Sequence, residues 1–111
     1  MVAYSADQNF NYQHAFVPFF GVPAATLVAT PELAERGNAV VRPFWFHCDA
    51  EGKYRLRIEP QWSGWPSGDP ETDAARYMHE LEQVVRQHPE QYLWVHRRFK
   101  TRPAGEASVY R

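Results

Sequence analysis

The chain has 111 residues, a formal net charge of −1 and a pI near 6.5. This length allows one domain, placed at 1–111, and an aromatic content of 15% argues against a disordered chain. The slight acidity makes a general nucleic-acid binder a poor fit, and the single cysteine, Cys48, excludes an internal disulfide.

Near the N-terminus, the sequence predicts a short strand over 2–4 that runs into a polar stretch. Residues 15–26 (AFVPFFGVPAAT) then carry Pro18, Gly21 and Pro23, which exclude a regular helix up to Pro23. We therefore predict a rigid apolar loop over this segment.

A helix is predicted over 24–36, with Gly37 as its C-terminal stop. Pro31 complicates this helix, because a proline in the interior removes a hydrogen bond and clashes with the preceding turn. Thr30 could instead cap a second helix that has Pro31 at its first position. The sequence leaves a kink and a break equally open.

A β-hairpin is predicted next. Residues 39–46 (AVVRPFWF) are rich in β-branched and aromatic side chains, and Pro43 implies an edge position or a bulge. The turn-forming stretch 48–53 (CDAEGK) leads into 54–60 (YRLRIEP), which alternates apolar and charged residues as a half-buried strand does.

Two C-terminal helices are predicted after a loop. Asp69, Pro70 and Glu71 combine a cap, a first-turn proline and a negative charge at the positive end of the helix dipole. Apolar residues follow at helical spacing up to position 88. Residues 88–90 (HPE) interrupt the pattern, and a shorter helix is predicted to hold 92–95 (YLWV).

Self-contained catalytic chemistry is not evident. None of the five histidines has metal-site spacing to another histidine or to the cysteine, so no metal or cofactor site is expected. His47, Cys48 and Asp49 are adjacent at a strand end, where neighbouring side chains point to opposite faces. Asp49 is therefore interpreted as a turn residue.

Three segments together carry a family resemblance: 7–10 (DQNF), 16–26 (FVPFFGVPAAT) and 89–103 (PEQYLWVHRRFKTRP). In this order and separation they resemble the C-terminal half of the late acyltransferases of lipid A biosynthesis, the lauroyl and myristoyl transferases of Gram-negative bacteria. The similarity runs from about Tyr4 into the tail. It implies the C-terminal portion of an α/β fold similar to glycerol-phosphate and lysophospholipid acyltransferases, built here from a short strand, a helix, a β-hairpin and two C-terminal helices.

The resemblance also implies an activity and its partners. Such enzymes act at the cytoplasmic face of the inner membrane, where they move a fatty acyl group from acyl carrier protein to a lipid A precursor. Acyl-acyl carrier protein would be the co-substrate, and no further cofactor is implied. The segment 38–46 (NAVVRPFWF) resembles the strand that carries an apolar-apolar-proline signature in this superfamily, with Arg42 inserted between Val41 and Pro43.

Catalysis in this superfamily uses a histidine followed five residues later by an acid, the histidine acting as general base. The residues five places after the histidines of this chain are Phe19, Gly52, Val84, Leu93 and Thr101. The resemblance places the dyad and the membrane anchor upstream of the part covered here. Because it lacks the dyad, the chain alone is expected to be inactive. It is also expected to be soluble, because it has no apolar run of ~20 residues and no secretory leader.

Several site residues follow from the resemblance. Asp7 matches the first acid of an Asp-x-Asp stretch thought to support the reaction centre, although the second position here is Asn9. Gln8 is a weaker substrate-binding candidate. An acyl chain needs a dry apolar wall, for which the candidates are Phe16, Phe19 and Phe20, with core packing as an equal alternative.

A cationic cluster completes the predicted site. Guanidinium groups bind phosphates and carboxylates through paired hydrogen bonds, which suits an acidic carrier protein, a lipid A precursor and an anionic membrane surface. The alternative is a solvated surface whose ion pairs contribute about 0–1 kcal/mol each. The cluster comprises Arg97, Arg98, Lys100 and Arg102.

Two other classes of function stay open on the residues alone. Aromatic residues interleaved with arginines in the tail would suit a small α/β module that contacts RNA or an acidic protein, although the net charge argues against nucleic acid. A structural half-domain that completes the fold of a partner segment would expose apolar surface.

Overall fold

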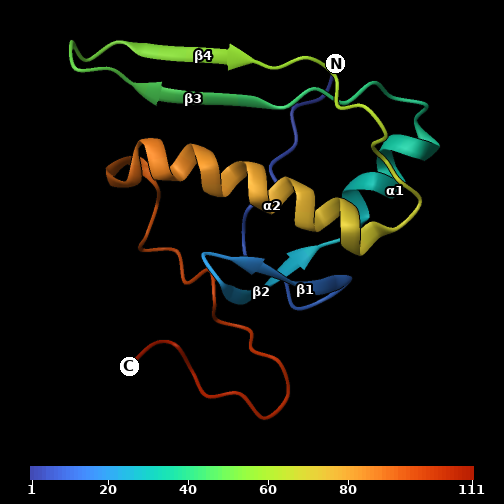
Figure 1. Ribbon diagram of the computed structural model, residues 1–111, viewed down its shortest axis with the longest axis vertical. Helices are drawn as coiled ribbons and strands as arrows, with labels where there is room; N and C mark the ends of the chain where they lie inside the picture. Colours follow the sequence, from blue (N-terminus) through green and yellow to red (C-terminus); the bar gives the residue numbers. More distant parts are fainter.

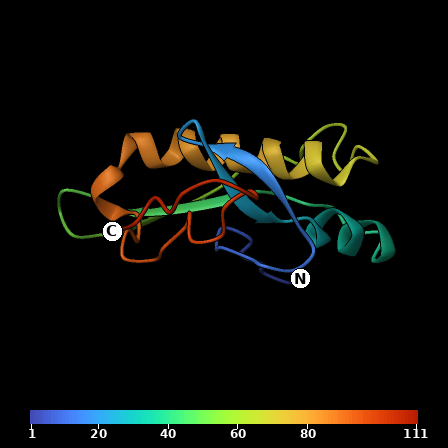
Figure 2. The same cartoon turned by 90° about the horizontal axis from the view of Figure 1, so that it is seen from below.

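The computed structural model describes residues 1–111 and shows a flat α/β slab with extents of 41 × 39 × 19 Å (Figures 1 and 2). A long helix, α2 (Pro70–Gln87), crosses the middle of the slab. One antiparallel hairpin lies on each side of α2, and a short helix, α1 (Ala29–Arg36), lies beside its N-terminal end (Figure 1). The C-terminal tail runs without regular structure past the first hairpin.

The first hairpin consists of β1 (His14–Phe19) and β2 (Val22–Leu27), so the predicted rigid loop over 15–26 is wrong. The strands turn at Phe20 and Gly21, whose φ angles of 50° and 74° suit a two-residue hairpin loop. Pro18 and Pro23 face each other across the ladder.

The two prolines are tolerated because of the register. The N–H of Val28 donates to the carbonyl of Gln13 at 3.0 Å, so Gln13 and Val28 form a hydrogen-bonded pair. Hydrogen-bonded and non-hydrogen-bonded pairs alternate along an antiparallel ladder. Pro18 and Pro23 then form a non-hydrogen-bonded pair, so the N–H groups that they lack are not needed by the ladder. Counting prolines without knowing the register led to the wrong prediction.

The structure differs from both predictions for the first helix. Residues 24–27 belong to β2, and α1 begins at Ala29 after Val28, so no helix over 24–36 exists for Pro31 to kink or break. Pro31 is the third residue of α1, and the Thr30 hydroxyl makes no hydrogen bond. Gly37 ends the helix as predicted, and its N–H donates to the carbonyl of Leu33 at 3.0 Å. The strand predicted over 2–4 does not form.

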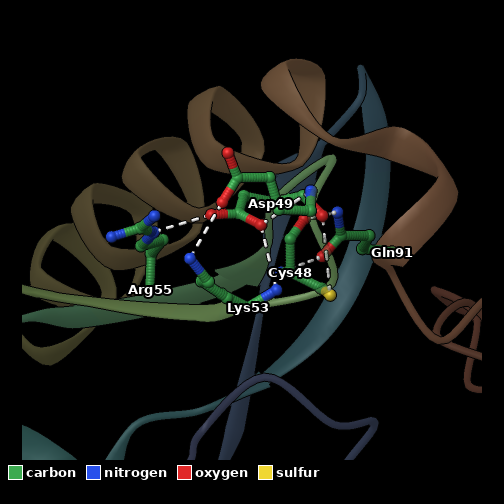
Figure 3. Close-up of polar contacts among 6 residues, drawn as sticks. Cys48, Asp49, Lys53, Arg55 and Gln91 are labelled. Atoms are coloured by element: carbon green, nitrogen blue, oxygen red, sulfur yellow. Dashed lines mark hydrogen bonds and ion pairs between the residues drawn. The ribbon is translucent and has the colours of Figure 1, made fainter.

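The second hairpin consists of β3 (Phe44–Cys48) and β4 (Tyr54–Ile58), which confirms that 39–60 holds a hairpin. The first strand begins at Phe44 and not at position 39, so Pro43 lies just before it, and every residue of β4 is exposed, so the half-buried strand predicted over 54–60 is wrong. Asp49 organises the turn (Figure 3): its carboxylate accepts hydrogen bonds from the N–H groups of Glu51 and Lys53 and from Nε of Arg55. These bonds, with the Lys53 N–H as the largest contributor, lower the pKa of Asp49. Asp49 is the turn residue that the sequence predicted.

Helix α2 begins as predicted, with the Asp69 carboxylate accepting from the N–H of Glu71 at 3.2 Å. The helix predicted to hold 92–95 is wrong: a single 3₁₀ turn, η1 (Pro89–Gln91), follows α2, and the chain is extended at Tyr92. Long-range partners replace helical bonds here, because the Gln91 amide bonds to both backbone groups of Cys48.

The core lies between the first hairpin and α2, where Val17, Phe19 and Ala24 meet Met78 and Leu81. Phe19 and Met78 are completely buried. No helix of the chain has both the length and the apolar character that crossing a bilayer requires.

Candidate functional site

The molecule contains an apolar hollow of about 840 Å³. Its walls come from the N-terminal segment, α1, the segment before and within β3, and one side of α2. Of the 32 residues that line it, 21 are hydrophobic. The chain thus forms an apolar enclosure of the size that small-molecule ligands occupy.

A small group of polar side chains lies at one part of the hollow. Asp7, Tyr77 and Tyr92 all line it, and Asp7 accepts a hydrogen bond from the hydroxyl of Ser5. Burial, followed by the negative charge of Asp7, raises the pKa of Tyr92 to about 12 and raises the pKa of Tyr77 as well. Both tyrosines therefore keep their hydroxyl protons at neutral pH and remain hydrogen-bond donors.

Arg98 lies behind this polar group and is 2% exposed. Its Nη1 donates to the carbonyl of Ala25 and its Nη2 to the hydroxyl of Thr26, each at 2.7 Å. Burial lowers the pKa of Arg98, while Tyr92 and Asp7 oppose the shift. Arg98 thus fastens the tail to β2 from the inside of the molecule, where no carboxylate forms an ion pair with it.

The four cations of the predicted cluster do not lie together. Arg102 is also directed inward, donating to the carbonyl of Pro23 at 2.6 Å and pairing with Glu106. Arg97 is exposed, with its guanidinium 5.7 Å from the ring centre of Tyr110. Lys100 is exposed and forms no ion pair within the chain. Two of these cations anchor the tail, and the other two face solvent.

The three predicted phenylalanines lie apart from the hollow. Phe19 is in the core against Tyr92, Phe16 is half-buried beside His14, and the half-buried Phe20 packs under the guanidinium of Arg86 at 4.8 Å. Gln8 is exposed. Among the predicted residues, only Asp7 lines the hollow.

Most of the hollow's walls were missed at the level of sequence. The segment 39–47 supplies one wall, and its apolar residues are typical of a strand whichever way their side chains face, so the sequence pattern does not indicate a cavity. His47 and His88 also reach the hollow and stack with ring centres 4.3 Å apart and 13° between the ring planes. Nothing in their sequence positions indicates this pairing, because 41 residues separate them.

The available groups limit what chemistry the chain can perform. No three histidine, cysteine, aspartate or glutamate side chains come together as a metal site. Asp73, a buried acid at the hollow, accepts hydrogen bonds from the N–H of Ser67, which lies 2.9–3.0 Å from both carboxylate oxygens. The arrangement of one carboxylate, two phenols and an apolar enclosure suits the binding of a ligand with a long apolar part and a polar end.

The fold and the hollow define a small α/β protein with an apolar cavity, and comparison with known proteins gives the family. Residues 1–101 match the family described as bacterial lipid A biosynthesis acyltransferase. The chain belongs to this family. The resemblance inferred from the three sequence segments is thereby confirmed.

Named relatives agree with this assignment. The palmitoleoyltransferase and the lauroyltransferase of lipid A biosynthesis from Escherichia coli K12 are each 40% identical to the chain over 113 residues, covering 98% and 99% of it. The myristoyltransferase of the same organism is 33% identical over 110 residues. The chain spans only about a third of the length of these relatives, with 36%, 37% and 34% of each covered.

Proposed function

We propose that the chain forms the C-terminal portion of a lipid A acyltransferase, which transfers a lauroyl or myristoyl group from acyl carrier protein to a lipid A precursor. The family membership supports this proposal, as do relatives whose names specify lauroyl, myristoyl and palmitoleoyl transfer. The complete fold would be similar to glycerol-phosphate acyltransferases and would act at the cytoplasmic face of the inner membrane.

The apolar hollow is the observation that supports this proposal most directly. We propose that it binds the fatty acyl chain. Its volume of about 840 Å³ lies within the ~300–1,000 Å³ of typical ligand sites. Each methylene group moved from water into such a site contributes about 0.8 kcal/mol. A saturated chain of twelve or fourteen carbons would therefore be held by its length, and the walls need no polar groups along most of it.

The polar end of the hollow would orient the acyl group. Asp7 lies at this end with the two protonated tyrosines, so hydroxyl donors are available to a carbonyl oxygen there. Arg97 and Lys100 are the tail cations left for an anionic partner such as the carrier protein, the acceptor phosphates or anionic lipid. Arg98 and Arg102 would act by holding the tail in place.

The RNA-binding alternative lacks comparable support. Arg98 and Arg102 donate to β2, which leaves the predicted cluster with two outward-facing cations in place of a continuous basic strip. The named relatives are acyltransferases.

Binding of an acyl chain can be measured with dibrominated stearic acid, which quenches tryptophan by contact. Trp45, Trp62 and Trp65 line the hollow, whereas Trp94 does not, so quenching should persist in Trp94→Phe. Val41→Phe fills part of the hollow and should weaken binding at least tenfold. Val109→Phe, on the exposed tail, is the matched control. Equal binding by both valine variants would show that the fatty acid lies elsewhere.

The chain alone is expected to bind without catalysing transfer, because no histidine is followed five residues later by an acid. Incubation with labelled acyl-acyl carrier protein and a lipid A precursor measures this directly. Transfer above background would show that another group of this chain serves as the base.

A further inference from the structure

The two faces of the β3–β4 hairpin have different surroundings. On one face, Trp45 stacks on Tyr77 with ring centres 6.4 Å apart, and His47 stacks on His88, so this face packs on α2. The opposite face is apolar and uncovered. Its large side chains and their exposed fractions are Phe44 42%, Phe46 65%, Tyr54 79%, Leu56 63% and Ile58 58%.

The outer edge of β4 is uncovered as well. The N–H of Glu59 donates to the carbonyl of Pro43, and that of Asp49 donates to the carbonyl of Lys53, so hydrogen-bonded pairs fall at the odd-numbered positions. The backbone groups of Tyr54, Leu56 and Ile58 therefore point away from β3. No strand pairs with them, because this sheet has only two strands.

The outer edges of β2 and β3 have partners at some positions, whereas no hydrogen bond covers the outer edge of β1. Arg98 and Arg102 donate to outward-facing carbonyls of β2, at Ala25 and Pro23. At the end of β3, the Gln91 amide donates to the carbonyl of Cys48 at 2.9 Å and accepts from its N–H at 2.7 Å, as a neighbouring strand would (Figure 3). An unprotected, apolar edge such as that of β4 is what proteins normally cover.

The overall dimensions also indicate a missing contact. The accessible surface of 7769 Å² exceeds the ~6,300 Å² expected of a compact 12.9 kDa monomer by roughly 1,500 Å². The radius of gyration is 14.8 Å, against about 13 Å for a compact chain of this length. The surplus is larger than the ~800 Å² that each partner contributes to a standard protein interface.

We propose that the bare face and outer edge of the β3–β4 hairpin dock against the portion of the acyltransferase fold to which this chain has no counterpart. That portion would add a strand along β4 and an apolar layer over Phe46 and Leu56. Since Phe44 and Phe46 also line the hollow, the same contact would close the hollow over a bound acyl chain. This inference rests on the proposed function.

Two observations favour this occupant over others. A lipid surface would cover the apolar side chains but leave the backbone groups of β4 unpaired, which costs several kcal/mol per group in hydrocarbon. A second copy could pair with the edge. However, relatives that are 40% identical across nearly the whole chain, the hairpin included, are almost three times as long and contain ample structure to cover it.

The test follows amide hydrogen exchange by NMR in the 111-residue chain. The added probe is the part of the Escherichia coli lauroyltransferase that this chain does not match, purified in dodecyl maltoside. In the chain alone, the amides of Tyr54, Leu56 and Ile58 should exchange quickly, and those of Arg55 and Arg57, which face β3, slowly. With the probe, the first three should slow at least tenfold.

The variant Phe46→Lys/Leu56→Lys changes a directly opposite pair on the bare face and should abolish the protection. Arg57→Gln, at an exposed position of the same hairpin whose side chain points to the other face, should retain it. The resonances of β1, β2 and α2 report whether each variant is folded.

Other outcomes would overturn the inference. These are no protection with the probe, equal protection in the lysine variant, protection only by phosphatidylglycerol vesicles, or protection that rises with the concentration of the chain alone. Acyl transfer by the mixture is assayed separately. Protection without transfer would support the docking surface and contradict the proposed function. Transfer without protection would support the proposed function and contradict the docking surface.

Discussion

The two hairpins of this protein are similar in length and pairing but opposite in environment. In β1–β2, Val17, Phe19, Ala24 and Thr26 are buried. In β4 every residue is exposed, although the strand alternates as a half-buried strand should. The two hairpins are both antiparallel and both contact α2. Their own sequences therefore do not explain why one is in the core and the other at the surface.

The difference lies in what reaches each hairpin from elsewhere in the chain. The tail brings Arg98 to β2 across 73 residues and Arg102 across 79, and α2 covers the inner face of the first hairpin. The β3–β4 hairpin packs against α2 on one face, and Gln91 forms hydrogen bonds with one position of its edge. Burial in this molecule is decided by distant segments, and an apolar strand without such a segment stays exposed.

The largest expected contrast comes from removing one phenylalanine ring from each hairpin. Phe19→Ala deletes a fully buried ring that contacts Tyr92 and Phe99, and should lower the free energy of unfolding by about 3–5 kcal/mol. Phe46→Ala removes a ring that is 65% exposed and should change it by less than about 0.5 kcal/mol. Urea denaturation followed by tryptophan fluorescence measures both. Similar changes in the free energy of unfolding for the two variants would contradict the conclusion that only the first hairpin belongs to the core.

A smaller effect is expected from the cation that covers the edge of β2. Arg98→Met leaves the Ala25 carbonyl and the Thr26 hydroxyl without their donor, at a cost of about 2–4 kcal/mol. It should also release the tail to trypsin cleavage after Lys100. Arg97→Met is the neighbouring control, since Arg97 is exposed, and should change stability little. If the two variants are equally stable, Arg98 does not anchor the tail.

The smallest effect concerns the turn of the exposed hairpin. Hydrogen bonds lower the pKa of Asp49 in the folded state below its ordinary 3.8. Its stabilisation is therefore complete well above pH 3.8 and is lost as the pH falls through the lower, folded-state pKa. The NMR signals of the turn should show this loss in the wild type and lack it in Asp49→Asn. Glu51→Gln is the control, and an unchanged pH profile in Asp49→Asn would exclude this role.

Local signals predicted the second hairpin and the start of α2 correctly. The alternation of 54–60, the turn residues before it and the sequence Asp69-Pro70-Glu71 each act within a few residues, so no tertiary information is needed. The prediction for the first hairpin was wrong because the effect of Pro18 and Pro23 on a strand depends on their partners across the ladder. The prediction of a short helix over 92–95 was wrong. Gln91 forms a hydrogen bond with Cys48, and Trp94 forms one with Pro89.

The site shows the same limit. Asp7 was identified from the family resemblance, and the structure places it at the hollow. The burial of Arg98 could not be predicted, since a run of arginines and lysines indicates a solvated surface until the acceptors on β2 are known. The pairing of His47 with His88 joins residues from β3 and the end of α2, and no spacing rule connects them.

The use of Arg98 to complete the edge of β2 has a consequence for biosynthesis. The strand leaves the ribosome long before the residue that covers it, because Ala25 and Arg98 are 73 residues apart. During that interval the carbonyls of Pro23 and Ala25 in the nascent hairpin lack the arginine donors that they have in the folded chain. A polypeptide whose translation stops before Arg98 lacks these hydrogen bonds to β2. Such truncated products are expected to aggregate and to be substrates for chaperones and proteases.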